Sequence, residues 1–211
     1  GIDHEPMICY NGAYIVHQGK ALASTEMSIE TVQSIYNLAD RLSIKLGLYH
    51  KDEWYSEEKT ERIQKEILHT KTTPVIRNTR ATLKDWKQRK IGAHKIMLMG
   101  TKESTDLMFD ALRSKFAYAV QQYRSNDTLI EISPKTVSKL SAISYVLAKD
   151  ETLEDVIAFG DNYNDIEMLK NVGCGVAVAN ARDEVKAIAN HIALKNVDDG
   201  VAHFIKQHIL I

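Results

Sequence analysis

The chain has 211 residues, of which 27 are basic and 28 are acidic, so its formal net charge is −1. This length suffices for one large domain or two small ones. Balanced charge gives no general attraction to nucleic acid or to an anionic membrane, so a charged ligand must be held by a local site. Two cysteines are too few for a disulfide framework, which favours a reducing, cytoplasmic setting. No apolar run approaches the ~20 residues of a membrane span.

The first elements in chain order are predicted as strands. Met7 to Val16 is an apolar stretch interrupted by Asn11-Gly12, and a second strand ends near Met27. From Ser28 onward apolar residues recur at three- and four-residue spacing, which predicts an amphipathic helix with Ser28 as its N-cap.

The middle of the chain is predicted to be a meander of strands with helices, as in an α+β module. Residues 46–49 and 53–55 form a predicted hairpin, residues 56–70 a charged helix or loop, and residues 72–91 give no clear pattern. A strand at 94–99, a helix at 103–116 and strands at 118–124 and 128–132 follow. In the helix, the residues expected to face inward are Leu107, Phe109, Leu112 and Phe116.

From Ser138 onward, helices and short apolar strands alternate. Helices are predicted at 138–148, 164–172, 182–190 and after Asp198, with strands at 156–159 and 175–178. This alternation is typical of a doubly wound parallel sheet. The fold class is therefore α/β, with residues 1–24 and 131–211 as pieces of one core and residues 25–130 as an inserted α+β domain.

The segment IAFGDNYNDIEML, residues 157–169, concentrates polar groups where a strand ends. Asp161 follows the strand directly, the place where ligands bind in open parallel sheets, and Asn164 and Asp165 stand at the start of the next helix. Crowded carboxylates require a cation, and an exposed Asp at a strand end suits Mg²⁺. Asn164 can offer its amide to a phosphate.

This segment has two alternative interpretations. Asn164 could simply cap the helix while Asp161 and Asp165 are solvated loop acids. A calcium-binding EF-hand loop would need an oxygen ligand at Tyr163, glycine at Ile166 and glutamate at Val172, and it fails at all three positions.

GDNYND, followed by IEML, GVAVANA and VDDG, resembles the C-terminal half of the haloacid dehalogenase-like (HAD) phosphatases, in particular the Cof-type branch with a large α+β cap. ICYNGA and EISPKTVSKLSAI also resemble that branch. The resemblance implies an HAD-like core, incomplete at the N-terminus, with a cap domain inserted.

The resemblance also implies site roles. Asp161 would be the Mg²⁺ ligand, Asn164 a phosphate contact, and Asp165 an acid that orients the metal waters or the lysine. Lys139 would neutralise the transferring phosphoryl group, with Lys135 as a less favoured alternative. Asn11 would lie at the end of a core strand near the cap hinge, although it could equally be a turn asparagine.

The DxDGT-like motif that carries the nucleophile of the family is absent from this sequence. The chain is therefore expected to begin after that motif and to be inactive by itself. It would expose unpaired strand edges, so it should lose the core, exchange a strand with another chain in a homo-oligomer, or be part of a longer protein.

The leading functional hypothesis is a Mg²⁺-dependent phosphatase of small phosphorylated metabolites such as sugar phosphates, acting through an aspartyl-phosphate whose aspartate lies upstream. The alternative is a catalytically silent phosphate-binding or regulatory protein. The soluble domain of an ion-pumping ATPase is disfavoured because no membrane span is present. Trp54, Tyr55, Arg77, Arg80 and Arg124 are candidates for substrate contacts by residue type alone.

Overall fold

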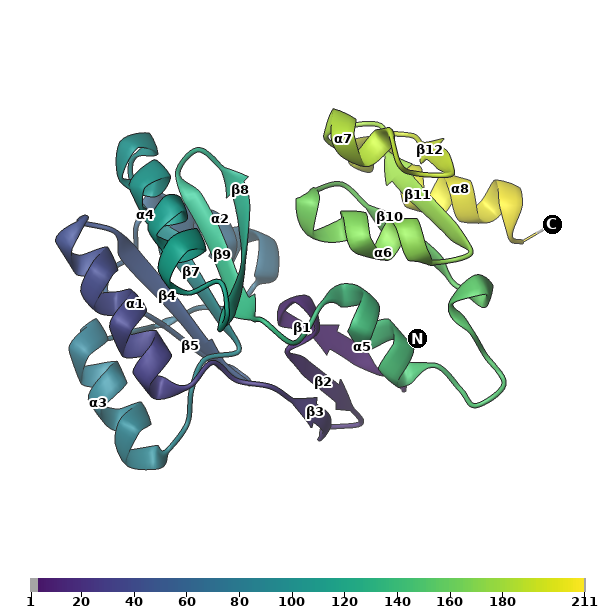
Figure 1. The fold of residues 1–211 in the computed structure, drawn as a ribbon. Helices are drawn as coiled ribbons and strands as arrows, with labels where there is room; N and C mark the ends of the chain where they lie inside the picture. Colours follow the sequence, from purple (N-terminus) through teal and green to yellow (C-terminus); the bar gives the residue numbers. More distant parts are fainter. Residues whose placement is uncertain (1–3, 211) are drawn as a thin grey trace. The chain divides into compact units, whose positions relative to one another are not determined.

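A computed structural model describes residues 4–210, which form two compact units (Figure 1). The first unit extends to Val137 and the second begins at Ser138. The predicted assignment of residues 1–24 and 131–211 to one core, around a cap of residues 25–130, stays a prediction.

The first unit begins with a small antiparallel sheet. Strand β1 (Met7–Cys9) pairs with β2 (Tyr14–His17), which pairs in turn with β3 (Lys20–Ser24). Asn11-Gly12 interrupts the apolar stretch as predicted, because a 3₁₀ turn over Tyr10–Gly12 reverses the chain between β1 and β2. Asn11 adopts left-handed backbone angles there, with φ 57°, a conformation that asparagine tolerates better than most residues.

A six-stranded sheet forms the main body of the first unit. Its strand order is β6-β5-β4-β7-β9-β8, in which only the β5–β6 pair is parallel. The strands are β4 (Lys45–His50), β5 (Glu53–Ser56), β6 (Val75–Ile76), β7 (Lys95–Met99), β8 (Val120–Asn126) and β9 (Leu129–Pro134). The predicted hairpin at 46–55 and the predicted pair of strands near 118–132 are confirmed.

Helices cover the sheet unequally. Helices α1 (Ile29–Arg41), α3 (Thr79–Arg89) and α4 (Lys102–Lys115) pack on one face, as Figure 1 shows. Helix α2 (Glu61–Thr70) places Ile63 and Ile67 against the opposite face. Ser28 is the N-cap of α1, as predicted, since its side chain accepts a hydrogen bond from the Thr31 amide.

One inward position of α4 is predicted wrongly. Leu107 is 60% exposed, whereas Thr105, Met108 and Leu112 are buried. Residues 105, 108 and 112 follow the three- and four-residue spacing of one helix face, and Leu107 lies about 100° away from Met108 around the axis. The orientation of α4 therefore follows its packing against β8, β9 and α1.

The second unit contains a three-stranded parallel sheet, of which two strands are predicted and the third, at residues 191–193, is not. Strand β11 (Cys174–Val178) lies between β10 (Ile157–Gly160) and β12 (His191–Ala193). The helices are α5 (Lys139–Val146), α6 (Ile166–Asn171), α7 (Asp183–Lys186) and α8 (Gly200–His208). The core packs α6 and α7 against this sheet through Leu169, Val185 and Ala177.

Helix α7 is shorter than the predicted 182–190 segment because Asn190 is bound to the neighbouring strand. Its side-chain oxygen accepts a hydrogen bond from the Gly175 amide at 2.7 Å, and its own amide donates to the Gly175 carbonyl at 2.8 Å. The chain must leave the helix to reach this position, and strand β12 follows at once. Within residues 4–210, no helix is long and apolar enough to cross a bilayer.

Candidate functional site

The polar segment after β10 folds around one buried carboxylate. Asp165 is only 2% exposed, and its Oδ2 accepts hydrogen bonds from the backbone amides of Asp161 at 2.9 Å and Asn162 at 3.1 Å. Residues Tyr163–Asp165 form a 3₁₀ turn that continues into α6. Asp165 therefore fixes the backbone at the carboxyl end of β10, from which the Asp161 side chain projects.

Lys139 neutralises this buried carboxylate. Its Nζ donates to Oδ1 of Asp165, the oxygen that the two amides leave available. Lys139 is the first residue of α5, and the Ser138 and Ser141 side chains form a capping box that fixes the start of that helix. Two segments separated by 26 positions are thus joined by a charge-assisted hydrogen bond.

The approach of Asp165 to the end of β10 requires glycine at position 160. A Cβ atom added to Gly160 would lie 2.5 Å from Cβ and 2.8 Å from Cγ of Asp165, too close for real contacts. The glycine of the GDNYND segment therefore has a packing reason that the sequence alone does not reveal.

Asp161 is an exposed residue of this unit, but the surrounding residues of the same unit partly bury its carboxyl group. This partial burial, followed by the negative charge of Asp165, raises the pKa of Asp161, while Lys139 acts in the opposite direction. A nearby cation would therefore stabilise the ionised form of Asp161. A single accessible carboxylate is the kind of donor that Mg²⁺ accepts in proteins, because this ion keeps several waters. The donor set at this strand end fits Mg²⁺.

The other two candidate residues have different settings. Asn164 lies half-buried in the 3₁₀ turn, between Tyr163 and Asp165. Asn11 belongs to the first unit, in the Tyr10–Gly12 turn. Lys139, Asp161, Asn164 and Asp165 thus come from the second unit, and the contacts given above join Lys139, Asp161 and Asp165.

Arg182 contacts the site loop, residues 161–165, although no sequence pattern points to it. Its Nε donates to the Asn162 side-chain oxygen at 3.0 Å, its amide donates to the Asp161 carbonyl at 3.1 Å, and its guanidinium lies 4.8 Å from the centre of the Tyr163 ring. It thus binds the same loop from the start of α7. No spacing rule connects positions 161 and 182, so only the parallel pairing of β10 and β11 reveals this contact.

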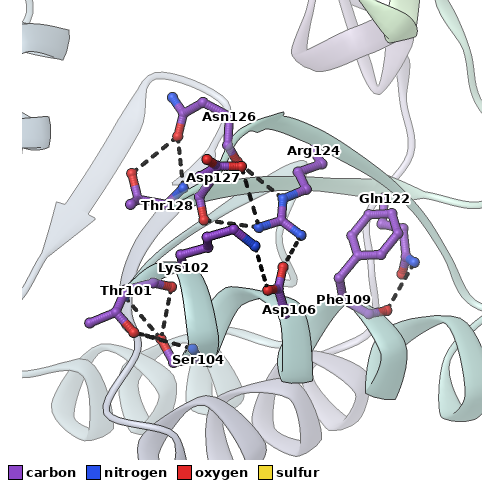
Figure 2. Close-up of polar contacts among 10 residues, drawn as sticks. All are labelled: Thr101, Lys102, Ser104, Asp106, Phe109, Gln122, Arg124, Asn126, Asp127 and Thr128. Atoms are coloured by element: carbon purple, nitrogen blue, oxygen red, sulfur yellow. Dashed lines mark hydrogen bonds and ion pairs between the residues drawn. The ribbon is translucent and has the colours of Figure 1, made fainter.

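Four of the five substrate-contact candidates in the first unit have structural partners. Arg124 binds the Asp106 carboxylate and the backbone carbonyls of Asn126 and Asp127 (Figure 2). Arg80 binds Tyr36 and Asp40, Arg77 binds Ala81 and Asp85, and the Tyr55 hydroxyl donates to Glu53. Trp54 differs from these four because it lines a pocket.

A histidine cluster also lies in the first unit. One ligand-type atom from each of Glu26, His50 and His94 lies within 4.8 Å of the others. These groups already serve as hydrogen-bond partners: His50 Nδ1 pairs with the Gly92 carbonyl at 3.0 Å, Glu26 accepts from the Gly92 amide at 2.6 Å, and His94 Nδ1 accepts from the Lys51 amide at 3.2 Å. The cluster therefore links the end of β4 to the segment before β7.

Comparison with known proteins gives consistent matches. The model of the haloacid dehalogenase-like hydrolase family matches residues 1–205. A putative phosphatase of Haemophilus influenzae is 36% identical over 117 residues, which are 54% of this chain and 44% of the relative. The pyridoxal phosphate phosphatase YbhA of Escherichia coli is 48% identical over 66 residues, which are 31% of this chain and 24% of the relative. The matched segments thus span less than half of these curated relatives.

Solved structures match over more of the chain. The crystal structure of a haloacid dehalogenase-like hydrolase from Bacteroides thetaiotaomicron aligns with a TM-score of 0.81 at 27% identity, covering 97% of this chain and 76% of the other. The agreement includes the α/β fold with a cap domain that the sequence predicted. Because the family model spans nearly the whole chain, this protein belongs to the haloacid dehalogenase-like hydrolases.

Proposed function

We propose that this chain is the cap and C-terminal core of a Mg²⁺-dependent phosphatase that hydrolyses small phosphorylated metabolites. The observation that carries the proposal is the Lys139–Asp165 pair, whose acid also binds the amides of Asp161 and Asn162. Phosphoryl transfer depends on positioned positive charge more than on covalent chemistry by the protein, and this arrangement supplies a fixed cation beside an accessible carboxylate.

Each of the four candidate site residues of the second unit has a role in this proposal. Lys139 neutralises charge on the transferring phosphoryl group and on the nucleophile, while Asp165 holds the ammonium in place. Asp161 would hold Mg²⁺ and Asn164 would bind a phosphate oxygen through its amide. Mg²⁺, when bound, supplies charge stabilisation at the phosphoryl oxygens. The nucleophilic aspartate is proposed to lie in sequence upstream of Gly1, and Asn11 is proposed to approach the substrate from the first unit.

The relatives support this class of reaction. The Escherichia coli relative is named a pyridoxal phosphate phosphatase and the Haemophilus influenzae relative a putative phosphatase. Only the first of these names gives a substrate, pyridoxal phosphate, and the second names a phosphatase in general. We therefore propose that the substrate of this protein is a small phosphomonoester. We also propose that the protein acts in the cytoplasm.

The test is phosphate release from a panel of phosphomonoesters by the chain expressed together with its upstream coding sequence. We expect activity with Mg²⁺ and its loss in EDTA. Asp161→Asn and Lys139→Met should each lower kcat by roughly 10²- to 10³-fold, the effect of removing one charge-stabilising group. Asp150→Asn, at an exposed position of the same unit, is the matched control. Phosphate binding without hydrolysis on any substrate would favour a silent binding protein instead.

A further inference from the structure

Both polar backbone groups of Asp161 are bound within the second unit. Its amide donates to Oδ2 of Asp165 at 2.9 Å, and its carbonyl accepts a hydrogen bond from the Arg182 amide at 3.1 Å. These two contacts restrict the backbone rotations on either side of the Asp161 Cα atom, which are the only soft rotations that the chain has there. The direction in which the Asp161 carboxylate projects therefore depends on residues outside the strand that carries it.

The side chain of Arg182 adds a contact to the next residue of the site loop. Its Nε donates to Oδ1 of Asn162 at 3.0 Å, and the same oxygen accepts the Tyr163 amide at 2.9 Å. The Asn162 amide donates to Asp165 at 3.1 Å. Asn162 thus joins the buried acid Asp165 to the exposed cation Arg182, so rotation of Asn162 would break contacts with both.

Tyr163 holds the guanidinium group of Arg182 in place. The guanidinium carbon lies 4.8 Å from the centre of the Tyr163 ring, and the ring hydroxyl donates to Oε1 of Glu184 at 3.2 Å. A guanidinium within about 6 Å of an aromatic ring centre is attracted to the ring. Arg182 is the residue before α7 and Glu184 lies in its first turn, so the site loop is attached to the start of this helix at two points.

The charge of Arg182 would by itself oppose a cation at Asp161. Burial and the charge of Asp165 raise the pKa of Asp161, whereas Lys139 and, more weakly, Arg182 act in the opposite direction. A positive charge near a carboxylate repels a metal ion that binds to it. Arg182 can therefore favour an ion at Asp161 only through the conformation of the site loop. Its two effects have opposite signs, which makes them separable by experiment.

We propose that Arg182 is a positioning residue for Mg²⁺ binding: through Asn162 it holds the site loop in the conformation that presents the Asp161 carboxylate to the ion. This inference rests on the proposed function, in which Asp161 holds Mg²⁺. Arg182 acts through the loop and needs no contact with the ion or the phosphoryl group. Because Mg²⁺ demands nearly ideal octahedral geometry, its affinity depends on the direction of a ligand carboxylate.

The experiment is a Mg²⁺ titration of the chain expressed together with its upstream coding sequence, followed by NMR at the amide resonances of Asp161 and Asn162. Arg182→Met removes the charge and the Nε donor but keeps the amide that binds Asp161. We expect its dissociation constant for Mg²⁺ to rise by about two- to tenfold, the range of one hydrogen bond. Loss of the charge alone would lower that constant. Unchanged or tighter binding by Arg182→Met would therefore overturn the proposal.

A conservative variant and a control on the same helix sharpen this result. Arg182→Lys keeps a donor that can reach Asn162, so it should bind Mg²⁺ more tightly than Arg182→Met; weaker binding would contradict the proposal. Lys186→Met removes an ammonium that pairs with Asp183 at 2.7 Å on α7, and it should leave the affinity for Mg²⁺ unchanged. An effect of Lys186→Met as large as that of Arg182→Met would mean that charge on α7, rather than the loop contact, is responsible.

A double substitution tests whether Arg182 acts through Asn162. Asn162→Ala removes the acceptor of the Arg182 Nε contact, so it should also weaken Mg²⁺ binding. Adding Arg182→Met to Asn162→Ala should then change the dissociation constant little, because the contact is already lost. Fully additive effects of the two substitutions would contradict the proposed route.

The inference and the proposed function fail separately. Arg182→Met should need more Mg²⁺ for half-maximal phosphate release but reach a similar kcat at saturating Mg²⁺, whereas Asp161→Asn should not recover. If Mg²⁺ binds with the expected ranking of variants but no phosphomonoester is hydrolysed, the role of Arg182 is supported and the phosphatase proposal fails. If phosphate is released and Arg182→Met needs no additional Mg²⁺, the role of Arg182 fails and the phosphatase proposal holds.

Discussion

Lys139 and Asp165 form an ion pair in which the acid side chain is 3% exposed and the base 32% exposed. The pair is therefore asymmetric: water can stabilise the lysine if its partner is lost, but it cannot reach the carboxylate. Breaking the pair from the lysine side should destabilise the second unit more than the loss of an exposed lysine does.

Lys139→Met should cost about 1–3 kcal/mol in the free energy of opening of the second unit. This is less than the 3–5 kcal/mol typical of fully buried pairs, because a third of the lysine is already exposed and Asp165 keeps its two amide donors. Hydrogen exchange of amides in α6 and β11 measures this quantity. Lys149→Met, at an exposed lysine of the same unit, is the control; equal exchange in the two variants would show that the pair is not stabilising.

Gly160→Ala tests the close approach of β10 to Asp165. The added methyl group would lie 2.5 Å from the Cβ atom of Asp165, so the acid or the strand must move. We expect a loss of about 1–3 kcal/mol, typical of overpacking, in the same exchange experiment. In an Asp165→Gly background the same substitution should cost much less. Additive effects of the two substitutions would mean that the steric contact is unimportant.

The sequence predicts β10, β11 and the starts of the helices of the second unit because these strands are short and apolar and the helix starts are clear, but it misses β12, which follows the contact between Asn190 and Gly175. The GDNYND segment also identifies Asp165 as an important acid. The sequence cannot reveal that Asp165 binds two amides of its own loop and Lys139 at once, because that depends on the 3₁₀ turn at Tyr163–Asp165. The contacts of Arg182 with Asp161 and Asn162 likewise depend on the pairing of β10 with β11, which the sequence does not reveal.

Helix α3 shows why residues 72–91 gave no clear pattern. Its buried positions are Thr79, Thr82, Leu83 and Trp86, which follow helical spacing. Two of these four positions are threonines, so an apolar pattern is not visible there. Burial of threonine on a helix face follows from tertiary packing, which the sequence alone does not display.

The buried His94 should make the folding stability of the first unit fall at acidic pH. Burial, with smaller contributions from His50 and Lys51, lowers the pKa of His94 to about 4, while Glu26 acts in the opposite direction. The unfolded chain has a His pKa near 6.5, so the unfolded state binds the proton more readily between these values. The stability that a neutral His94 contributes is therefore complete above about pH 6.5 and is lost as the pH falls toward 4.

The expected loss over that interval is roughly 2–3 kcal/mol, measured by urea unfolding at several pH values. His94→Gln, which cannot be protonated, should remove this part of the pH dependence even if it lowers stability at neutral pH. His69→Gln, at an exposed position of α2, should leave the pH dependence unchanged. An identical acid slope in the wild-type chain and His94→Gln would contradict the assignment.

The start of α4 offers a test of a local stabilising contact in the first unit. Thr101 and Ser104 form a capping box, in which the Ser104 amide donates to Thr101 Oγ1 at 3.2 Å and the Thr101 amide donates to Ser104 Oγ at 3.0 Å (Figure 2). Thr101→Ala leaves the Ser104 amide without its acceptor, so it should lower stability by about 1 kcal/mol. Thr101→Ser keeps the hydroxyl and should cost much less. Faster exchange of the first-turn amides of α4 in Thr101→Ala alone is the expected result, and equal exchange in the two variants would show that the methyl group, rather than the cap, stabilises this helix.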